Sequence, residues 1–151
     1  MNEVEQAIID AAIKLFSQKG FAATSIRDLS KEVNMKSASL YHYFSSKKDL
    51  LDVIMRRYLT VLIRGAEQVI NEFIEKDPEL ALKNIIKFHV ESHGKEKLAA
   101  LVVDTEYRSL EGESREEIKE LRKQYEDLWI QILEKGKQKG VFFYSDKKIT
   151  S

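Results

Sequence analysis

The sequence has no cysteine and no long apolar run, and these two absences narrow the class of protein at once. Without cysteine, neither a disulfide nor a thiolate metal site can form, and a reducing cytoplasm is the expected location. No apolar run approaches the roughly 20 residues that a membrane-spanning helix needs. The first residues, MNEVEQAIIDAA, lack the basic segment that begins a secretory signal peptide. We therefore expect a cytoplasmic protein with one domain or two small ones.

The chain also lacks net charge, because 25 basic residues balance 25 acidic residues among its 151 residues. The charges are nevertheless unevenly distributed. Between residues 21 and 48 the acidic residues are Asp28 and Glu32, whereas the basic ones are Arg27, Lys31, Lys36, Lys47 and Lys48. Such a mild basic patch is compatible with nucleic-acid binding but does not establish it alone.

Apolar residues recur at helical spacing almost throughout, which predicts an all-α fold. A first helix is expected over residues 2–19, with Asn2 and Glu5 as a capping box and Gly20 after its end. A short helix over residues 25–33 follows, capped by Ser25 and Asp28. The sequence NMK then predicts a tight turn, because Asn34 tolerates the left-handed conformation.

Five more helices are predicted beyond this turn. A helix of about seven residues begins near Ser37 in the stretch SASLYHYFSSKKDLL. The others are expected at residues 46–75 with a Ser46–Asp49 cap, at 77–93 with an Asp77–Pro78 start, at 95–110, and from a Ser114–Glu117 capping box to Gly136 and Gly140. The apolar run after Gly140 has little chain left to pack against, so we expect the natural fold to continue further.

Two short helices joined by a three-residue turn, with a longer helix before them, are the parts of a helix-turn-helix DNA reader. In the second short helix, Leu40 and Phe44 share one face and would anchor it to the core. The remaining side chains of the helix could then face a DNA groove. The alternative is that the whole LYHYF stretch is core, and we accept that interpretation for Leu40 and Phe44 alone.

Residues 8–55 resemble the DNA-binding region of the TetR family of bacterial transcriptional repressors, over the stretch AAIKLFSQKGFAATSIRDLSKEVNMKSASLYHYFSSKKDLL. Asn34 and Ala38 replace glycines that are common in the family. The resemblance implies a homodimer that binds a double-stranded, pseudo-palindromic operator, with a DNA-binding domain at residues 1–46 and a helical ligand-binding and dimerisation domain at 47–151. The DNA contacts that it implies are Ser25, Arg27, Ser37, Ala38, Ser39, Tyr41, His42, Tyr43 and Lys47.

The segment from TEYRSLEG to KQKGVF is similar to the subgroup of this family that responds to acyl-CoA thioesters. That similarity implies a small hydrophobic effector such as an acyl-CoA. The candidate effector-binding residues are His89, His93, Tyr107, Arg108, Tyr125 and Trp129, where Arg108 would pair with an anionic head group. His89 and His93 share a helix face and could share a metal ion. No third ligand is nearby, so we expect neither a metal nor a cofactor, and the aromatic residues could equally be core.

Two other functions compete with that of a DNA-binding regulator. An enzyme is not expected, because the sequence shows no glycine-rich phosphate loop, nucleophile elbow or adequate metal set. A helical interaction module without specific DNA binding would explain the zero net charge, but not the cluster of aromatic and basic residues around one turn. Family members usually carry two further helices that build the dimer interface, so we expect this chain to lack its last helices and to dimerise weakly.

Overall fold

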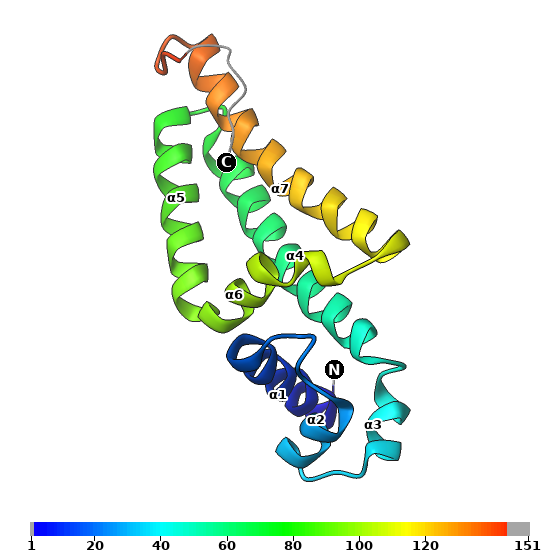
Figure 1. The fold of residues 1–151 in the computed structure, drawn as a ribbon. Coiled ribbons are helices and arrows are strands. Elements are labelled where there is room, and N and C mark those ends of the chain that lie inside the picture. Colours follow the sequence, from blue (N-terminus) through cyan, green and yellow to red (C-terminus); the bar gives the residue numbers. More distant parts are fainter. Residues whose placement is uncertain (1, 145–151) are drawn as a thin grey trace.

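The computed structural model describes residues 2–144, and within this range the fold is helical with no strand (Figure 1). The predicted all-α class is therefore confirmed. The elements are α1 (Glu3–Lys19), α2 (Ile26–Glu32), α3 (Ser37–Tyr43), α4 (Lys47–Phe73), α5 (Pro78–Lys95), α6 (Lys97–Thr105), the 3₁₀ turn η1 (Tyr107–Ser109) and α7 (Gly112–Gln138).

Four helices begin at the caps that the sequence predicts, because in each case the cap side chain accepts a backbone N–H. The four bonds run from Glu5 N to Asn2 Oδ1 at 2.8 Å, from Asp28 N to Ser25 Oγ at 3.0 Å, from Asp49 N to Ser46 Oγ at 3.0 Å and from Leu80 N to Asp77 Oδ1 at 3.1 Å. Asn34 has a φ of 54°, as the predicted turn requires. These starts are set by residues within one helical turn of each other.

The predicted start of the last helix is wrong. α7 begins at Gly112, whose φ of 61° lets the extended chain at Glu111 turn into the helix. Ser114 is therefore already inside α7, and its hydroxyl donates to Asp52 of α4 instead of capping. Glu117 likewise accepts a hydrogen bond from Arg56, which also binds Asp52. We call this group the Arg56 cluster: Asp52, Arg56, Ser114 and Glu117.

Two further boundaries differ from the prediction. The segment at residues 95–110 is interrupted at Glu96 and ends as an α-helix at Thr105. Gly136 does not close α7, which continues to Gln138, while Gly140 follows with a φ of 72°. Gly136 is buried against the ring of Phe142, and a Cβ there would lie only 1.9 Å from that ring. The glycine thus serves close packing rather than helix termination.

The helices form two groups that share α4 (Figure 1). The small group of α1, α2 and α3 lies at the start of α4, and α5 and α7 lie along the remainder, while α6 sits between α1 and α4. One continuous apolar core runs through both groups. Its fully buried members include Ile8, Phe16, Leu29, Leu50, Leu51, Met55, Ile85, Val102, Ile118 and Ile132.

The predicted domain boundary after residue 46 coincides with the N-cap of α4, and the last seven residues of the predicted second domain lie outside the described range. Across residues 2–144, the longest apolar stretch within a helix falls short of what a bilayer-spanning segment requires.

The contact between α4 and α5 depends on a missing side chain. A Cβ on Gly65 would lie 2.0 Å from the ring of Phe88, whereas Gly94, near the end of α5, has open space around it. We expect Gly65→Ala to be less stable than Gly94→Ala by about 2 kcal/mol, because both gain helix propensity but only the first is overpacked. Urea unfolding followed by circular dichroism measures this difference. Equal midpoints for the two variants would contradict the close packing.

Candidate nucleic-acid interface and ligand cavity

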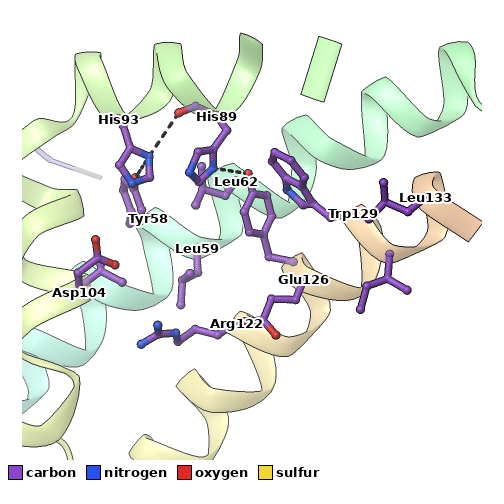
Figure 2. A pocket seen from close by; sticks show the side chains of 13 residues that line it. Tyr58, Leu59, Leu62, His89, His93, Asp104, Arg122, Glu126, Trp129 and Leu133 are labelled. Atoms are coloured by element: carbon purple, nitrogen blue, oxygen red, sulfur yellow. Dashed lines mark hydrogen bonds between the residues drawn. The ribbon is translucent and has the colours of Figure 1, made fainter. Parts of the chain in front are cut away.

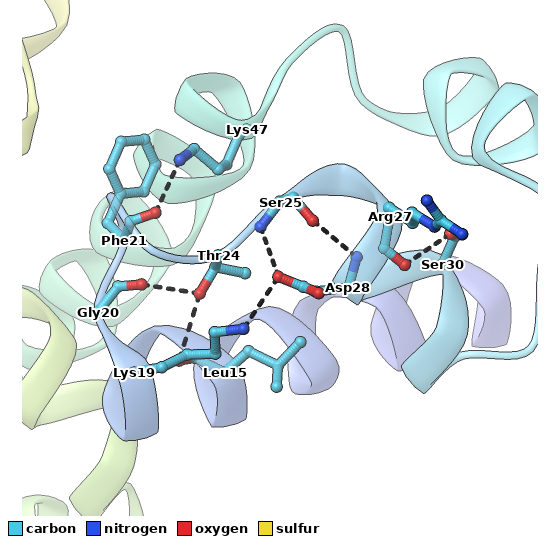
Figure 3. Close-up of polar contacts among 10 residues, drawn as sticks. All are labelled: Leu15, Lys19, Gly20, Phe21, Thr24, Ser25, Arg27, Asp28, Ser30 and Lys47. Atoms are coloured by element: carbon cyan, nitrogen blue, oxygen red, sulfur yellow. Dashed lines mark hydrogen bonds and ion pairs between the residues drawn. The ribbon is translucent and has the colours of Figure 1, made fainter.

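The orientation of α2 is fixed by a polar network at its first turn (Figure 3). Ser25 and Asp28 form a reciprocal capping box, with Ser25 N to Asp28 Oδ2 at 2.9 Å. Lys19 of α1 pairs with the same carboxylate at 3.0 Å. The Ser25 backbone N–H, together with Lys19, lowers the pKa of Asp28 to about 2. The carboxylate therefore stays ionised near neutral pH and holds α2 against α1.

The turn before these residues contains a second constraint that the sequence interpretation missed. Thr24 is only 1% exposed, and its hydroxyl donates to the carbonyl of Gly20 at 2.7 Å (Figure 3). A buried polar side chain needs such a partner, because an unpaired one would destabilise the fold. The position of Thr24 directly before the cap Ser25 was the only sequence signal for this role.

α3 is anchored through one face and leaves the other accessible. Leu40 is 3% exposed, whereas Tyr41 on the next position is 53% exposed. His42 is also exposed, and its ring meets the half-buried ring of Tyr43 edge-on at 5.6 Å between centroids. Hydroxyl and imidazole groups therefore project from the outer face of a short helix.

The nine predicted DNA contacts all lie on α2, α3 or the residues that flank them. The exposed ones are Ser25, Arg27, Ala38, Ser39, Tyr41 and His42, and the half-buried ones are Ser37, Tyr43 and Lys47. Ser37 is partly covered because its hydroxyl lies 3.3 Å from that of Ser30 on α2. The turn thus places small side chains at the start of α3 and larger polar ones further along it.

Lys47 is held in place by Phe21, a contact that the sequence interpretation did not foresee. Its Nζ donates to the carbonyl of Phe21 at 2.7 Å and lies 4.1 Å from the centroid of the same ring. Phe21 is buried and packs edge-on against Phe16 of α1 at 5.3 Å. The ammonium group therefore sits at the positive N-terminal end of α4 with donors remaining for an anion.

A cavity of about 450 Å³ lies between α4, α5, α6 and α7 (Figure 2). Its apolar lining comes from Leu59, Leu62, Val103, Ile130 and Leu133, and its polar lining from Tyr58, His89, His93, Asp104, Arg122, Tyr125, Glu126 and Trp129. The volume is within the range of small-molecule sites, which is roughly 300–1,000 Å³.

Two histidine–tyrosine pairs form the polar wall of this cavity. His89 Nδ1 lies 2.8 Å from the Tyr125 hydroxyl, and His93 Nδ1 lies 3.3 Å from the Tyr58 hydroxyl (Figure 2). Burial raises the pKa of both tyrosines, that of Tyr58 to about 12, and burial together with His93 lowers the pKa of His89. Both imidazoles thus pair with tyrosine hydroxyls, and no metal-ligand set of three residues occurs within residues 2–144.

Four of the six predicted effector residues, His89, His93, Tyr125 and Trp129, line the cavity, and two do not. α6 ends at Thr105, so Tyr107 and Arg108 belong to the 3₁₀ turn η1. They therefore do not continue the face of α6 that lines the cavity. Arg108 is exposed, and Tyr107 is covered by the guanidinium groups of Arg115 and Arg122.

The basic group of the cavity is Arg122, which the sequence interpretation overlooked (Figure 2). It shares a face of α7 with Glu126, Trp129 and Leu133, and this spacing of three and four residues was the signal that could have found it. Trp129 Nε1 is buried without a hydrogen bond of good geometry among the described residues. The Arg122 guanidinium and the Trp129 N–H are both hydrogen-bond donors that can bind an acceptor or an anionic group of a ligand.

Two family models match the chain. One, described as bacterial regulatory proteins of the tetR family, matches residues 8–54, and the other, described as a tetracyclin repressor-like C-terminal domain, matches residues 75–151. The chain belongs to the TetR family. The first match covers α1 to the start of α4, which carries every candidate DNA contact, and the second includes α5 to α7.

Other TetR-family proteins resemble most of the chain. The transcriptional repressor KstR2 of Rhodococcus jostii is 28% identical over 89% of this chain and 66% of its own length. The fatty acid metabolism regulator of Bacillus subtilis is 28% identical over 88% of this chain and 68% of its own length. The regulator PfmR of Thermus thermophilus has a solved structure that is 31% identical, with a TM-score of 0.84 over 92% of this chain and 75% of that one. The chain thus spans about two thirds of the length of these curated relatives.

The lowered pKa of His89 predicts that stability falls in mild acid. In the unfolded chain His89 binds a proton near its ordinary pKa of 6.5, whereas in the folded chain it binds one only at lower pH. The contribution of His89 to the free energy of unfolding is therefore fully present above pH 6.5 and is lost as the pH falls below that value. We expect His89→Gln to flatten this decrease, which urea midpoints at neutral and mildly acidic pH would measure. His42→Gln, at an exposed position on α3, is the control and should keep the wild-type profile. An unchanged profile for His89→Gln would contradict the assignment.

Proposed function

We propose that the protein is a ligand-responsive transcriptional repressor that binds a pseudo-palindromic operator as a homodimer and leaves it when a small hydrophobic effector binds. The observation that carries this proposal is the arrangement of α2, α3 and the first turn of α4. There, apolar anchors face inward, while hydroxyl, imidazole and basic groups remain accessible. Membership of the TetR family supports the same function.

In this proposal α3 enters the major groove with its N-terminal end toward the bases. Ala38 and Ser39 are small and exposed, so the backbone can come close to the DNA. Tyr41 and Lys47 bind phosphate oxygens on either side and fix the position of the helix without reading sequence. Two such readers in a dimer would bind half-sites about 34–36 Å apart.

The electrostatics of the reader favour this orientation. We call residues 25–47 the reader, and the acidic side chains in this range are Asp28 and Glu32. Both pair with lysines of α1, Asp28 with Lys19 and Glu32 with Lys14. Arg27, Lys31 and Lys36 make no ion pair within residues 2–144. Their charge is therefore available to phosphates, although the whole chain is neutral.

For the effector we propose an acyl-CoA or a chemically similar amphiphile. The apolar lining of the cavity suits an acyl chain, and its histidine–tyrosine wall offers hydrogen bonds to a carbonyl oxygen. Arg122 provides a positive charge for an anionic group. The name of the Bacillus subtilis relative, a fatty acid metabolism regulator, supports this ligand class.

α4 provides the connection between ligand and DNA in this proposal. Tyr58, Leu59 and Leu62 line the cavity from its middle, while its first turn carries Lys47. A ligand that prefers a different placement of α4 would shift the population toward a form in which the two readers do not match the half-sites. Such coupling between two sites is typically worth about 1–3 kcal/mol.

The DNA-binding role is tested by selecting bound fragments from genomic DNA and measuring their affinity for single variants. We expect Tyr41→Ala and Lys47→Ala each to weaken specific binding by about tenfold, the value of one phosphate contact. Lys83→Ala is the control, because Lys83 lies on α5 and pairs there with Glu79. If the wild type selects no fragment over bulk DNA, or both variants bind as it does, the proposed function is wrong.

The effector is tested through Trp129, the only tryptophan of the chain. We expect palmitoyl-CoA to change its fluorescence and to lower operator affinity, and coenzyme A alone to do neither. Arg122→Ala should weaken palmitoyl-CoA binding by about tenfold through loss of the charged contact, whereas Arg64→Ala, an exposed arginine of α4 outside the cavity, should not. The absence of any response across acyl chains of different length would argue against this ligand class.

A further inference from the structure

Glu106 links the ligand-binding half to the reader across 85 positions of sequence. It follows the last residue of α6, and its Oε1 accepts the backbone N–H of Phe21 at 3.2 Å. Its Oε2 accepts the hydroxyl hydrogen of Ser109 at 2.8 Å, which fixes the carboxylate in the η1 turn. The side chain thus has both oxygens occupied and is partly buried between the two groups of helices.

The residue that Glu106 holds is the one that holds Lys47. Phe21 donates its N–H to Glu106. Its carbonyl accepts a hydrogen bond from the Lys47 ammonium, which also lies over its ring (Figure 3). It follows Gly20, whose φ of 86° is a conformation that favours glycine. The N–H and carbonyl of Phe21 are therefore fixed from opposite sides, one by the ligand-binding half and one by the first turn of α4.

We propose that Glu106 is a positioning residue for DNA binding, which holds Phe21 so that Lys47 is already ordered before it contacts a phosphate. This inference rests on the proposed function. A free lysine side chain has many rotamers and loses much conformational entropy when it binds. The carbonyl and ring of Phe21 remove part of that loss in advance, but only while Phe21 itself stays in place. The hydrogen bond from its N–H to the Glu106 side chain keeps it there.

A role through position can be separated from a role through charge. Glu106→Asp keeps the negative charge, but its carboxylate is one methylene too short to reach Phe21 N. Glu106→Gln removes the charge and keeps an acceptor oxygen at the same distance. If the role is positional, the Glu106→Asp variant must bind the operator more weakly than the wild type, and the Glu106→Gln variant must bind it equally well.

The experiment measures the salt dependence of binding to a selected operator fragment. Each lost phosphate contact reduces the magnitude of the slope of log affinity against log salt concentration by about one per protomer, whereas a lysine that is less ordered but still reaches its phosphate weakens binding without changing that slope. We expect Lys47→Ala to reduce the slope, Glu106→Asp to weaken binding severalfold at every salt concentration with the wild-type slope, Glu106→Asp to have no further effect when Lys47 is alanine, and Glu106→Gln to bind as the wild type. Glu111→Asp is the matched control, since Glu111 pairs with Lys48 at 3.2 Å across the same junction, in an exposed position.

The outcomes distinguish this inference from the function on which it rests. If the wild type binds no DNA selectively, the proposed function fails. If Glu106→Asp binds as the wild type, or weakens binding by the same factor when Lys47 is alanine, Glu106 has no positioning role. Weaker binding by Glu106→Gln with normal binding by Glu106→Asp would show that charge, not position, is what matters. Equal losses with Glu111→Asp would show a general effect at the junction.

Discussion

Burial of α4 on several sides is the constraint on which the arrangement of the other helices depends. Its 27 residues pack against α1 at one end and against α5, α6 and α7 further along, and ten of its residues are buried. A hydrogen-bonded helix of this length is stiff, so a displacement at its middle is carried to its ends. The three cavity residues Tyr58, Leu59 and Leu62 therefore belong to the same helix as Lys47, and neither half can move without changing its contacts with the other.

The local features of the fold could be predicted from the sequence because they depend on residues within one helical turn. The caps at Asn2, Ser25, Ser46 and Asp77 and the turn at Asn34 are of this kind. Ser114 shows where such reasoning fails. It has the spacing of a cap, but Asp52 of α4 competes for its hydroxyl, and Gly112 offers an earlier start. A partner 62 residues away leaves no trace in a local pattern.

The candidate sites follow the same division. The residues of the reader are close in sequence, so one motif contains them all, whereas the cavity collects side chains from four helices. His89 and His93 were found because they share one helix face, but Tyr58 on α4 gives no periodic signal of its role. Arg108 was misplaced for a similar reason, since the end of α6 at Thr105 keeps it from the cavity, and residues outside that segment decide where α6 ends.

The Arg56 cluster gives the α4–α7 contact near the reader a different physical character from the buried middle of that contact. Near the reader, Arg56 pairs with Asp52 and Glu117 at partly exposed positions, and the hydrogen bonds that it donates to Asp52 raise the pKa of the guanidinium. Farther along, α7 is buried at Tyr125 and Ile132. Dissolved ions screen the first kind of contact and leave the second almost untouched. Ionic strength therefore acts inside the protein as well as on DNA binding: higher salt weakens the Arg56 cluster near the reader and the partly exposed Lys135–Glu75 pair at the far end of the two helices, while the buried contacts between them keep their strength.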